Sequence, residues 1–273
     1  MRLFRRNKGT LMITGASGFL GRHLMSHREQ GWQVFAPPHS SLDVCNLERV
    51  RHEMRSWEPD VVVHLAYRRD DRRAIVDGSR NVASAAAAAG ARLIHLSTDV
   101  VFAGRDTPYT EIDVPDATMD YGKWKAEAEL EVHRAHPNAV MVRTSLLYGT
   151  DQLSPGQHAV TEALTGGQPT TYFTDEYRCP VHAADVADAL IRLAEMPEVD
   201  GPLHVAGPQV LSRAELAAAF ARHLSLDETR LLTTTLAESG QHRPARVVLD
   251  TSKAAALGIT CRSVEEALRR PTV

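Results

Sequence analysis

Residues 11–22 read LMITGASGFLGR, and this stretch predicts how the chain begins to fold. The apolar run Leu11–Ile13 is typical of a buried strand. Leu20 and Leu24 are four residues apart, so they share one face of a helix. After the strand, glycines recur at a spacing of three, at Gly15, Gly18 and Gly21; the last of them falls within the expected helix. The stretch therefore predicts a strand, a glycine turn and a helix.

Such a turn suits a pyrophosphate group. Gly15 can take backbone angles closed to other residues, and Gly18 has no Cβ to hold a phosphate away. Gly21 lets the helix pack close to the strand, and the N–H groups that begin the helix would face the anion. Any tight strand-to-helix turn can carry the same glycines, so a dinucleotide site needs support from the rest of the chain.

The composition is that of a globular protein with a sizeable core. The 273 residues are 43% hydrophobic and 24% charged, and the net charge is -3, which argues against a nucleic-acid partner. No run approaches the ~18 apolar residues of a membrane helix, and the basic start is too short for a signal peptide. The three cysteines form no C-x-x-C pair, so no disulfide framework and no metal site are predicted. We expect a cytoplasmic protein with no membrane partner.

Strands alternate with helices through the first 150 residues. The helices are expected at 47–57, 74–89 and 120–134, and the later strands, mostly apolar, at 32–36, 61–66, 92–97 and 139–143. Apolar strands separated by helices predict an α/β fold with a doubly wound parallel sheet, a Rossmann fold.

The regular alternation of strands and helices stops after Gly149, which predicts a second, smaller lobe. Residues 151–180 are rich in Gly, Pro, Thr and Gln, and the later elements are short; Ser212 and Glu215 form a capping box for one helix. The expected lobes are an NAD(P)-binding Rossmann lobe over 1–150, with 181–206 returning to it, and a small α/β substrate-binding lobe mainly over 151–273.

The end of the second strand bears on the choice of cofactor. In NAD-preferring Rossmann folds an acidic residue near this point binds the ribose 2′-OH. Residues 36–40 read APPHS and carry neither a carboxylate that would repel a 2′-phosphate nor an arginine. NADP(H) is therefore favoured, and NAD(H) stays open. The charge run RRDDRR at 68–73 is expected to be a solvated loop rather than a phosphate clamp.

A tyrosine and a lysine stand one helical turn apart, at Tyr121 and Lys125. An ammonium beside a phenol favours the phenolate and so makes a tyrosine a better acid near neutral pH. Thr98 follows the fourth strand, at the edge where open α/β sheets bind ligands. Alone, the Tyr–Lys pair is most often a surface pair. In this order, with the glycine turn and a hydroxyl at a strand end, it predicts an acid–base site.

Together these motifs resemble the extended short-chain dehydrogenase/reductases, and within them the dTDP-4-dehydrorhamnose reductase branch. The resemblance runs along nearly the whole chain. Its segments are TGASGFLG (14–21), HLA (64–66), STDVVF (97–102), YGKWK (121–125), RTSLLYG (143–149), RP (243–244) and LDTSK (249–253).

The resemblance implies hydride transfer from NAD(P)H to a 4-keto sugar carried on a nucleoside diphosphate. It makes Tyr121 the proton donor, Lys125 the residue that lowers its pKa and holds the cofactor ribose, and Thr98 a hydrogen-bond donor to the carbonyl. The implied cofactor-binding residues are Gly15, Ser17, Gly18, Phe19, Leu20, Gly21, Asp43, Val44, Leu65, Ala66, Tyr121 and Lys125. The implied substrate-binding residues are Asp99, Val100, Leu146, Arg178 and Arg243. Either of these arginines could instead brace the second lobe.

Two departures from the family pattern concern the sugar site. Val100 stands where the rhamnose-pathway enzymes have a tyrosine, and Leu146 where they have a tryptophan. Both aromatic residues face the sugar in the family, so catalysis can be retained while the sugar differs. Tyr67 stands where small residues are usual and could partly refill the site.

Two alternative functions stay open. The same architecture occurs in the regulatory β subunit of methionine adenosyltransferase, which binds NADP and a partner protein and has a similar C-terminal pattern. A sugar-nucleotide epimerase or dehydratase is the other alternative, and Asp99 does not decide because dehydratases and rhamnose reductases both carry an acid there. The expected partner is a small-molecule substrate, and a homodimer stays open.

Overall fold

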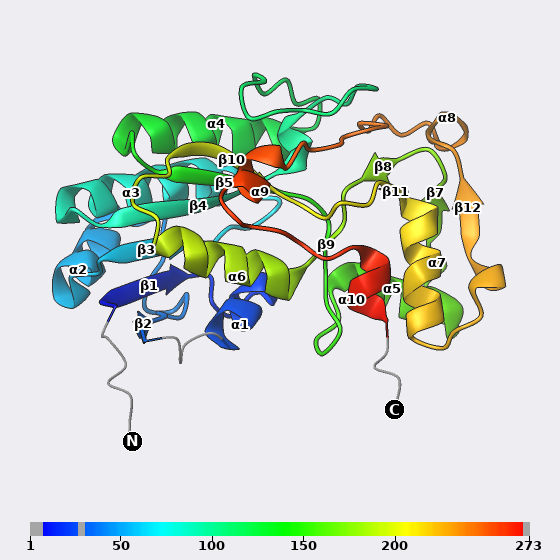
Figure 1. Ribbon diagram of the computed structural model, residues 1–273, viewed down its shortest axis with the longest axis horizontal. Helices are drawn as coiled ribbons and strands as arrows, with labels where there is room; N and C mark the ends of the chain where they lie inside the picture. The colour runs from blue at the N-terminus through cyan, green and yellow to red at the C-terminus, as the bar shows by residue number, and fades with distance from the viewer. Residues whose placement is uncertain (1–7, 27–30, 270–273) are drawn as a thin grey trace. The chain divides into compact units, whose positions relative to one another are not determined.

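The computed structural model describes residues 8–26 and 31–269 (Figure 1). The chain divides into two compact units. The first comprises Met1–Thr98, Asp120–Arg143 and Ala187–Leu203, and the second comprises Asp99–Met119, Thr144–Val186 and His204–Val273. The functional roles expected for two lobes stay a prediction.

A six-stranded sheet forms the centre of the first unit. Its strands are β1 (Thr10–Thr14), β2 (Gln33–Phe35), β3 (Val61–His64), β4 (Arg92–Thr98), β5 (Val140–Thr144) and β10 (Gly201–Val205), in the order β10-β5-β4-β3-β1-β2. β1 pairs in parallel with both β2 and β3, and β3 pairs in parallel with β4. Every residue of β3 is buried, as expected for a strand covered on both faces.

Helices connect these strands, and the fold is doubly wound. The helices are α1 (Phe19–Ser26), α2 (Leu47–Trp57), α3 (Arg72–Ala89), α4 (Asp120–Ala135) and α6 (Ala183–Ala194). The step from β1 to β2 crosses the sheet in the direction opposite to the steps from β2 to β5. Right-handed crossovers therefore place α1 on one face and α2, α3 and α4 on the other. α3 packs between α2 and α4 (Figure 1). The predicted α/β doubly wound parallel sheet is confirmed.

Local sequence explains where these helices begin and end. Asn46 caps α2, whose bounds match the prediction. Asp71 caps α3 by accepting from the N–H of Ala74, so this helix begins at Arg72, two residues earlier than predicted. It ends at Ala89, and the next residue, Gly90, has a positive φ of 69° that suits glycine.

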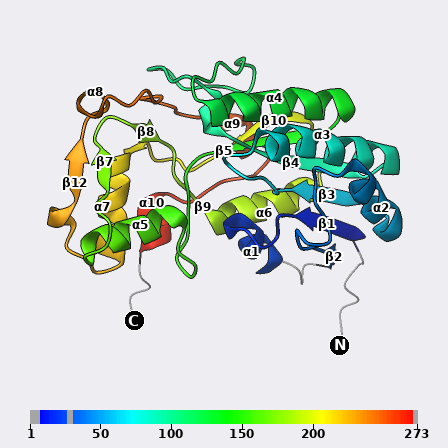
Figure 2. The ribbon, with the colours of Figure 1, turned by 180° about the vertical axis from the view of Figure 1, so that it is seen from behind.

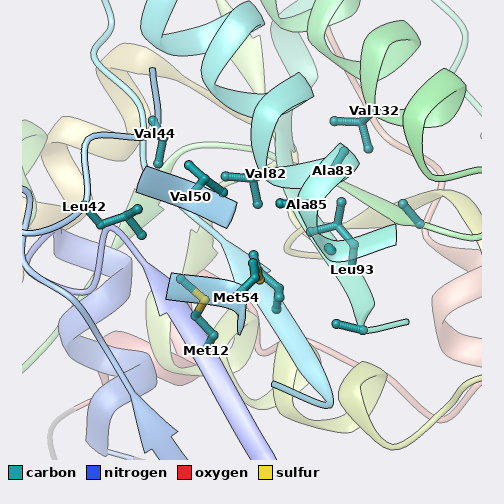
Figure 3. Close-up of a cluster of buried hydrophobic side chains, with 14 of the residues drawn as sticks. Met12, Leu42, Val44, Val50, Met54, Val82, Ala83, Ala85, Leu93 and Val132 are labelled. Carbon is teal, nitrogen blue, oxygen red and sulfur yellow. The ribbon is translucent and has the colours of Figure 1, made fainter. Parts of the chain in front are cut away.

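Small side chains let α3 pack closely on the sheet. Ala83 and Ala86 are fully buried in a cluster with Met12 of β1, Leu93 of β4 and Val132 of α4 (Figure 3). One face of the alanine-rich helix therefore belongs to the core, where each small side chain lets the helix approach its neighbours, while the end of the run, 87–89, is exposed.

The second unit is built from short elements. They are β6 (Leu147–Tyr148), α5 (Pro155–Leu164), β7 (Thr171–Phe173), β8 (Tyr177–Arg178), β9 (Val181–His182), β11 (Leu211–Ser212), α7 (Arg213–His223), β12 (Leu232–Thr234), α8 (Leu236–Ser239), α9 (Ser252–Ala256), α10 (Val264–Leu268) and two 3₁₀ turns, η1 (Asp99–Val101) and η2 (Glu228–Arg230). The strands form three two-stranded pairs, β11 with β8, β12 with β7, and β6 with β9. α7 lies beside the β7–β12 pair (Figure 2) and begins with the predicted capping box of Ser212 and Glu215.

Within the described part of the chain, no helix combines the length and the apolar character needed to cross a membrane.

Candidate active site

The glycine turn between β1 and α1 brings three chain segments into close contact. Gly15 has a φ of 74°, and a Cβ on it would lie 2.7 Å from the nitrogen of Ala66. A Cβ on Gly21 would lie 2.4 Å from the carbonyl oxygen of Gly15. A Cβ on Gly18 would meet only that same oxygen, at 3.2 Å, so the turn is open on this side. The turn therefore holds β1, α1 and the loop after β3 together and leaves a cradle that a side chain would fill.

A pocket of about 410 Å³ opens beside this turn, within the first unit. It is lined by the turn, by the segment after β2, by the loop after β3 and by the start of α3. The lining residues are Thr14–Gly18, Pro37, His39, Leu42–Cys45, Leu65–Arg68, Asp71, Arg73 and Ala74. The pocket thus lies at the carboxyl ends of three parallel strands, at the point where the strand order changes direction.

Most of the cofactor-binding residues expected from the sequence meet in this pocket. Those that line it are Gly15, Ser17, Gly18, Asp43, Val44, Leu65 and Ala66. Phe19, Leu20 and Gly21 do not line it. Leu20 and Gly21 are buried in α1, and Phe19 packs its ring edge-on against His23. Their expected role at the cofactor stays a prediction.

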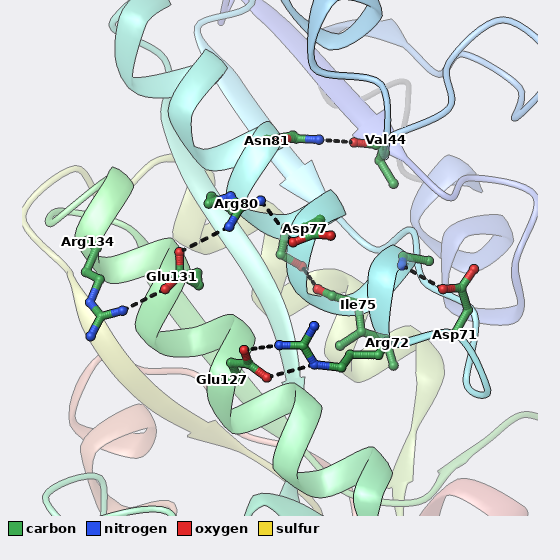
Figure 4. Close-up of polar contacts among 12 residues, drawn as sticks. Val44, Asp71, Arg72, Ile75, Asp77, Arg80, Asn81, Glu127, Glu131 and Arg134 are labelled. Carbon is green, nitrogen blue, oxygen red and sulfur yellow. Dashed lines mark hydrogen bonds and ion pairs between the residues drawn. The ribbon is translucent and has the colours of Figure 1, made fainter.

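Arginines of the 68–73 charge run were not expected in this pocket. Arg68 and Arg73 line it, and Arg73 lies near Cys45: burial and Asp43 raise the pKa of the Cys45 thiol, while the charge of Arg73 opposes them. Arg72 instead pairs with Glu127 of α4 (Figure 4). All four arginines of the run are exposed, as expected for a solvated segment, although Arg72 and Arg73 belong to the start of α3. Only the place of Arg68 and Arg73 in the pocket wall goes beyond the expectation. The run directly follows β3 and so begins at the ligand-binding edge of the sheet, a signal that sequence reasoning could have used.

A chain of hydrogen bonds ties the glycine turn to α3. The Ser79 hydroxyl donates to a backbone carbonyl one turn earlier (2.6 Å), so it accepts from the Nε2–H of His64 (3.2 Å). His64 Nδ1 then accepts from the Thr14 hydroxyl (2.7 Å), which accepts from the N–H of Ala66 (3.3 Å). Burial and the charge of Lys125 lower the pKa of His64 to about 3. The neutral ring therefore fixes Thr14 and Ala66, which both line the pocket.

The predicted catalytic residues come from one strand and one helix of the first unit. Thr98 is the last residue of β4, and α4 carries Tyr121 and Lys125. Lys125 is buried, and its Nζ donates to the carbonyl oxygen of Leu96 at 2.8 Å. Burial lowers the pKa of Lys125 to about 8, and the carboxylate of Glu129 opposes this shift. This contact joins the helix that bears Tyr121 to the strand that ends in Thr98.

Aromatic and cationic groups surround Tyr121. The ring of Tyr67 lies 6.0 Å from the ring of Tyr121, and Lys125 Nζ is 5.0 Å from the centre of the Tyr67 ring. The guanidinium of Arg69 lies 4.7 Å from the centre of the Tyr121 ring. Tyr67 thus adds aromatic surface at this place, and two cations lie close to the phenols.

In the second unit, Asp99 and Arg178 are buried and make contacts within the protein. The Ser145 hydroxyl donates to Asp99 at 2.6 Å, and Arg178 lies 3.8 Å from that carboxylate. Arg178 also pairs with Glu176 at 3.2 Å and donates to the carbonyl of Pro244 at 2.9 Å. This geometry favours the bracing role for Arg178 over contact with a substrate.

The other residues expected at the substrate differ in their surroundings. Leu146 packs against the buried cluster around Tyr148, and Val100 is half-buried in η1. Arg243 pairs with Glu176 at 2.9 Å and lines a pocket of about 850 Å³ together with Arg213. Further lining comes from threonines and aromatics of β7 and from β12. Arg243 therefore reaches a pocket of this unit.

Comparison with known proteins gives a consistent result over nearly the full length of the chain. A model of the RmlD substrate binding domain matches residues 9–272. Methionine adenosyltransferase 2 subunit beta of Rattus norvegicus is 32% identical over 281 residues, which cover 93% of this chain and 84% of that protein. Spore coat polysaccharide biosynthesis protein SpsK of Bacillus subtilis (strain 168) is 31% identical over 273 residues, 95% of either chain.

A solved structure gives the same answer for the fold. The dTDP-4-dehydrorhamnose reductase RfbD of Bacillus anthracis, crystallised in complex with NADP, matches with a TM-score of 0.87 at 25% identity and covers 96% of this chain and 97% of that one. The predicted resemblance is thereby confirmed. The chain belongs to the RmlD substrate binding domain family and has the fold of the extended short-chain dehydrogenase/reductases related to dTDP-4-dehydrorhamnose reductase.

Proposed function

We propose that this protein reduces the keto group of a nucleotide-linked 4-keto sugar with NAD(P)H, in the manner of a dTDP-4-dehydrorhamnose reductase. The coarser function, an NAD(P)-dependent sugar-nucleotide reductase, follows from the family and from the likeness to a solved reductase with NADP. One observation carries the finer proposal. The contact of Lys125 with Leu96 holds the Tyr121 helix against the strand that ends in Thr98, in the unit that contains the glycine-turn pocket.

The glycine-turn pocket fits a dinucleotide. The open side of Gly18 and the tight approach at Gly15 form a cradle that any Cβ would obstruct. Arg68 and Arg73 add positive charge. Asp43 and Asp71 also line the pocket, but each accepts a backbone N–H, from Cys45 and from Ala74, and residues 36–40 add no carboxylate. This balance supports NADP(H) as the favoured cofactor and leaves NAD(H) as a weaker ligand.

Each residue of the catalytic group has a distinct task. Bound cofactor supplies a hydride to the keto carbon. Tyr121 donates a proton to the keto oxygen, and the buried Lys125 ammonium stabilises the phenolate that remains. The Thr98 hydroxyl donates a hydrogen bond to the same oxygen and so favours the charge that develops there.

The pocket of the second unit supports a substrate with a diphosphate. Arg243 and Arg213 bring two guanidinium groups to its wall, while the carboxylate of Glu176 pairs with Arg243. Burial lowers the pKa of Arg213, an arrangement that an incoming anion would relieve. The threonines of β7 and β12 would supply neutral hydrogen-bonding groups.

A panel of nucleotide 4-keto sugars tests the proposal. Purified protein is mixed with NADPH and with dTDP-, UDP- or GDP-linked 4-keto-6-deoxy sugars, and NADPH oxidation is followed by absorbance. We expect turnover with at least one member and the corresponding 4-hydroxy sugar as product. Tight NADPH binding without oxidation by any member would contradict the proposal.

A subunit role is the second candidate function. Methionine adenosyltransferase 2 subunit beta has higher identity to this chain than the solved reductase has, at 32% against 25%. A protein with this role would bind NADP without reducing a sugar and would co-purify with a methionine adenosyltransferase. Co-purification from the native host, combined with the panel above, separates the two functions.

A further inference from the structure

Glu129, one helical turn after the predicted catalytic Lys125, has a buried carboxylate that the proposed catalytic chemistry does not use. Glu129 is four residues after Lys125 on α4, so Tyr121, Lys125 and Glu129 form one column along the helix. The Glu129 side chain is 6% exposed. A carboxylate in such a place costs free energy unless it is paired.

Two neighbouring strands supply the partners of Glu129. Arg143 of β5 donates to it from Nη2 at 2.8 Å and from Nε at 3.1 and 3.2 Å. The hydroxyl of Ser97, the residue before Thr98, donates to it at 2.5 Å. With the bond from Lys125 to Leu96, the end of β4 is joined to α4 at two successive residues.

Among the described charged groups that act on the Lys125 ammonium, Glu129 is the one that favours it. His64 of β3 and His95 of β4 face the ammonium, and burial, with the Lys125 charge, lowers the pKa of both rings, so they are neutral at pH 7. The loop after β3 contributes the ring of Tyr67. Burial disfavours the ammonium, and Glu129 acts in the opposite direction.

We propose that Glu129 is a positioning residue of the active site whose carboxylate keeps the buried Lys125 in its ammonium form. Arg143 and Ser97 hold that carboxylate in place and neutralise part of its cost of burial. The catalytic meaning of the Lys125 charge rests on the proposed function, whereas the electrostatic coupling of Glu129 to Lys125 does not.

The composition of the chain makes a direct test possible. There are four lysines, Lys8, Lys123, Lys125 and Lys253. Full-length protein labelled with ¹³C and ¹⁵N in lysine alone gives four side-chain signals, and loss of one in Lys125→Met identifies Lys125. A pH titration of the four signals then reports the ionisation of Lys125 in each variant.

We expect Glu129→Gln to lower the titration midpoint of Lys125 by about one pH unit, since it removes a nearby negative charge at low dielectric. The matched control is Glu127→Gln, the same change on the exposed side of the same helix, where Glu127 pairs with Arg72 (Figure 4). That variant should leave the midpoint in place. Ser97→Ala removes a hydrogen bond to Glu129 but keeps its charge, so it too should leave the midpoint in place.

A second variant guards against a folding defect. Glu129→Gln leaves Arg143 buried beside a neutral group, so Glu129→Gln with Arg143→Gln keeps the site free of an unpaired charge. Because Arg143→Gln also removes a positive charge, which by itself favours the ammonium, the midpoint should fall by less than in Glu129→Gln alone. Glu129→Asp should largely restore it. An unchanged midpoint in both neutral variants, or an equal fall in Ser97→Ala, would overturn the role of Glu129. Absence of sugar reduction by the wild type would instead overturn the proposed function and leave the titration valid.

Discussion

Lys125 Nζ donates a hydrogen bond of 2.8 Å to the carbonyl oxygen of Leu96, two residues before Thr98. This contact spans from the first turns of α4 to the end of β4. It places a lysine and a threonine that are far apart in sequence at one edge of the sheet. Because the ammonium is buried, its charge affects neighbouring groups more strongly than it would in water.

Tyr121→Phe removes one oxygen and leaves the packing of α4 in place. If Tyr121 donates the proton, turnover of a nucleotide 4-keto sugar should fall by about 10²–10⁴. The Kd for NADPH, measured by fluorescence titration, should stay within a factor of about two, because the glycine-turn pocket is formed by other residues. Wild-type turnover in this variant would contradict the assignment.

Lys125→Met keeps the length of the side chain and removes its charge. Turnover and NADPH affinity should both fall, since the proposed ammonium acts on Tyr121 and on the cofactor ribose. In the wild type, turnover should decline as pH rises through about 8, where Lys125 loses its proton. The pH profile of kcat measures this decline. If its midpoint stays in place in Glu127→Gln but moves in Glu129→Gln, the decline is assigned to Lys125.

Loss of the Lys125 proton should lower turnover but raise the stability of the fold. The pKa of Lys125 is lowered by burial to about 8 in the folded protein, from an ordinary value of 10.5. Between these values the unfolded chain binds more protons, so the contribution of Lys125 to the free energy of unfolding rises with pH across this window. Urea unfolding of both proteins at pH 8 and pH 10 checks this: the free energy of unfolding of the wild type, relative to that of Lys125→Met, should be higher at pH 10 than at pH 8.

Acid should destabilise the fold through His64. Its pKa is lowered by burial, and by the charge of Lys125, to about 3 from an ordinary value of 6.5. The unfolded chain therefore binds more protons between about pH 6.5 and pH 3, and stability should fall as pH falls through this window. His64→Gln should flatten this dependence in urea unfolding, whereas His158→Gln, at an exposed site on α5, should not.

Arg73 should contribute to the choice between the two cofactors. If it contacts the 2′-phosphate, Arg73→Gln should weaken NADPH binding by about tenfold or more, the value of a charged hydrogen bond, and leave NADH binding unchanged. Arg72→Gln is the matched control, because Arg72 pairs with Glu127 on α4. Equal losses for NADPH and NADH would assign Arg73 to another part of the cofactor.

Local patterns in the sequence predicted much of the first unit and the start of one helix in the second. The glycine turn, the bounds of α2, the stop of α3 at Gly90 and the capping box at Ser212 depend on residues within a few positions of one another. Apolar runs separated by helices indicated the doubly wound sheet, and the spacing of Tyr121 and Lys125 indicated one face of α4.

Tertiary structure alone decided which distant residues meet. Pairing of β1 with β3 brings Gly15 within contact of Ala66, and the packing of α3 on β3 lets Ser79 bind His64. The same packing places Arg73, near the start of α3, in the wall of the pocket. These contacts join residues that are about 15 to 50 or more positions apart, and no local periodicity encodes them.

The second unit shows the same division. From the sequence, Arg178 and Arg243 could each bind a substrate or brace the second lobe. The fold encloses Arg178 with Asp99 and Glu176 and leaves Arg243 at a pocket. The amino-acid sequence dictates which chemical groups this protein has and the order of its strands and helices. Which groups are buried, paired or open to a ligand was decided by the packing of distant segments, because burial and charge pairing exist only once the chain has folded.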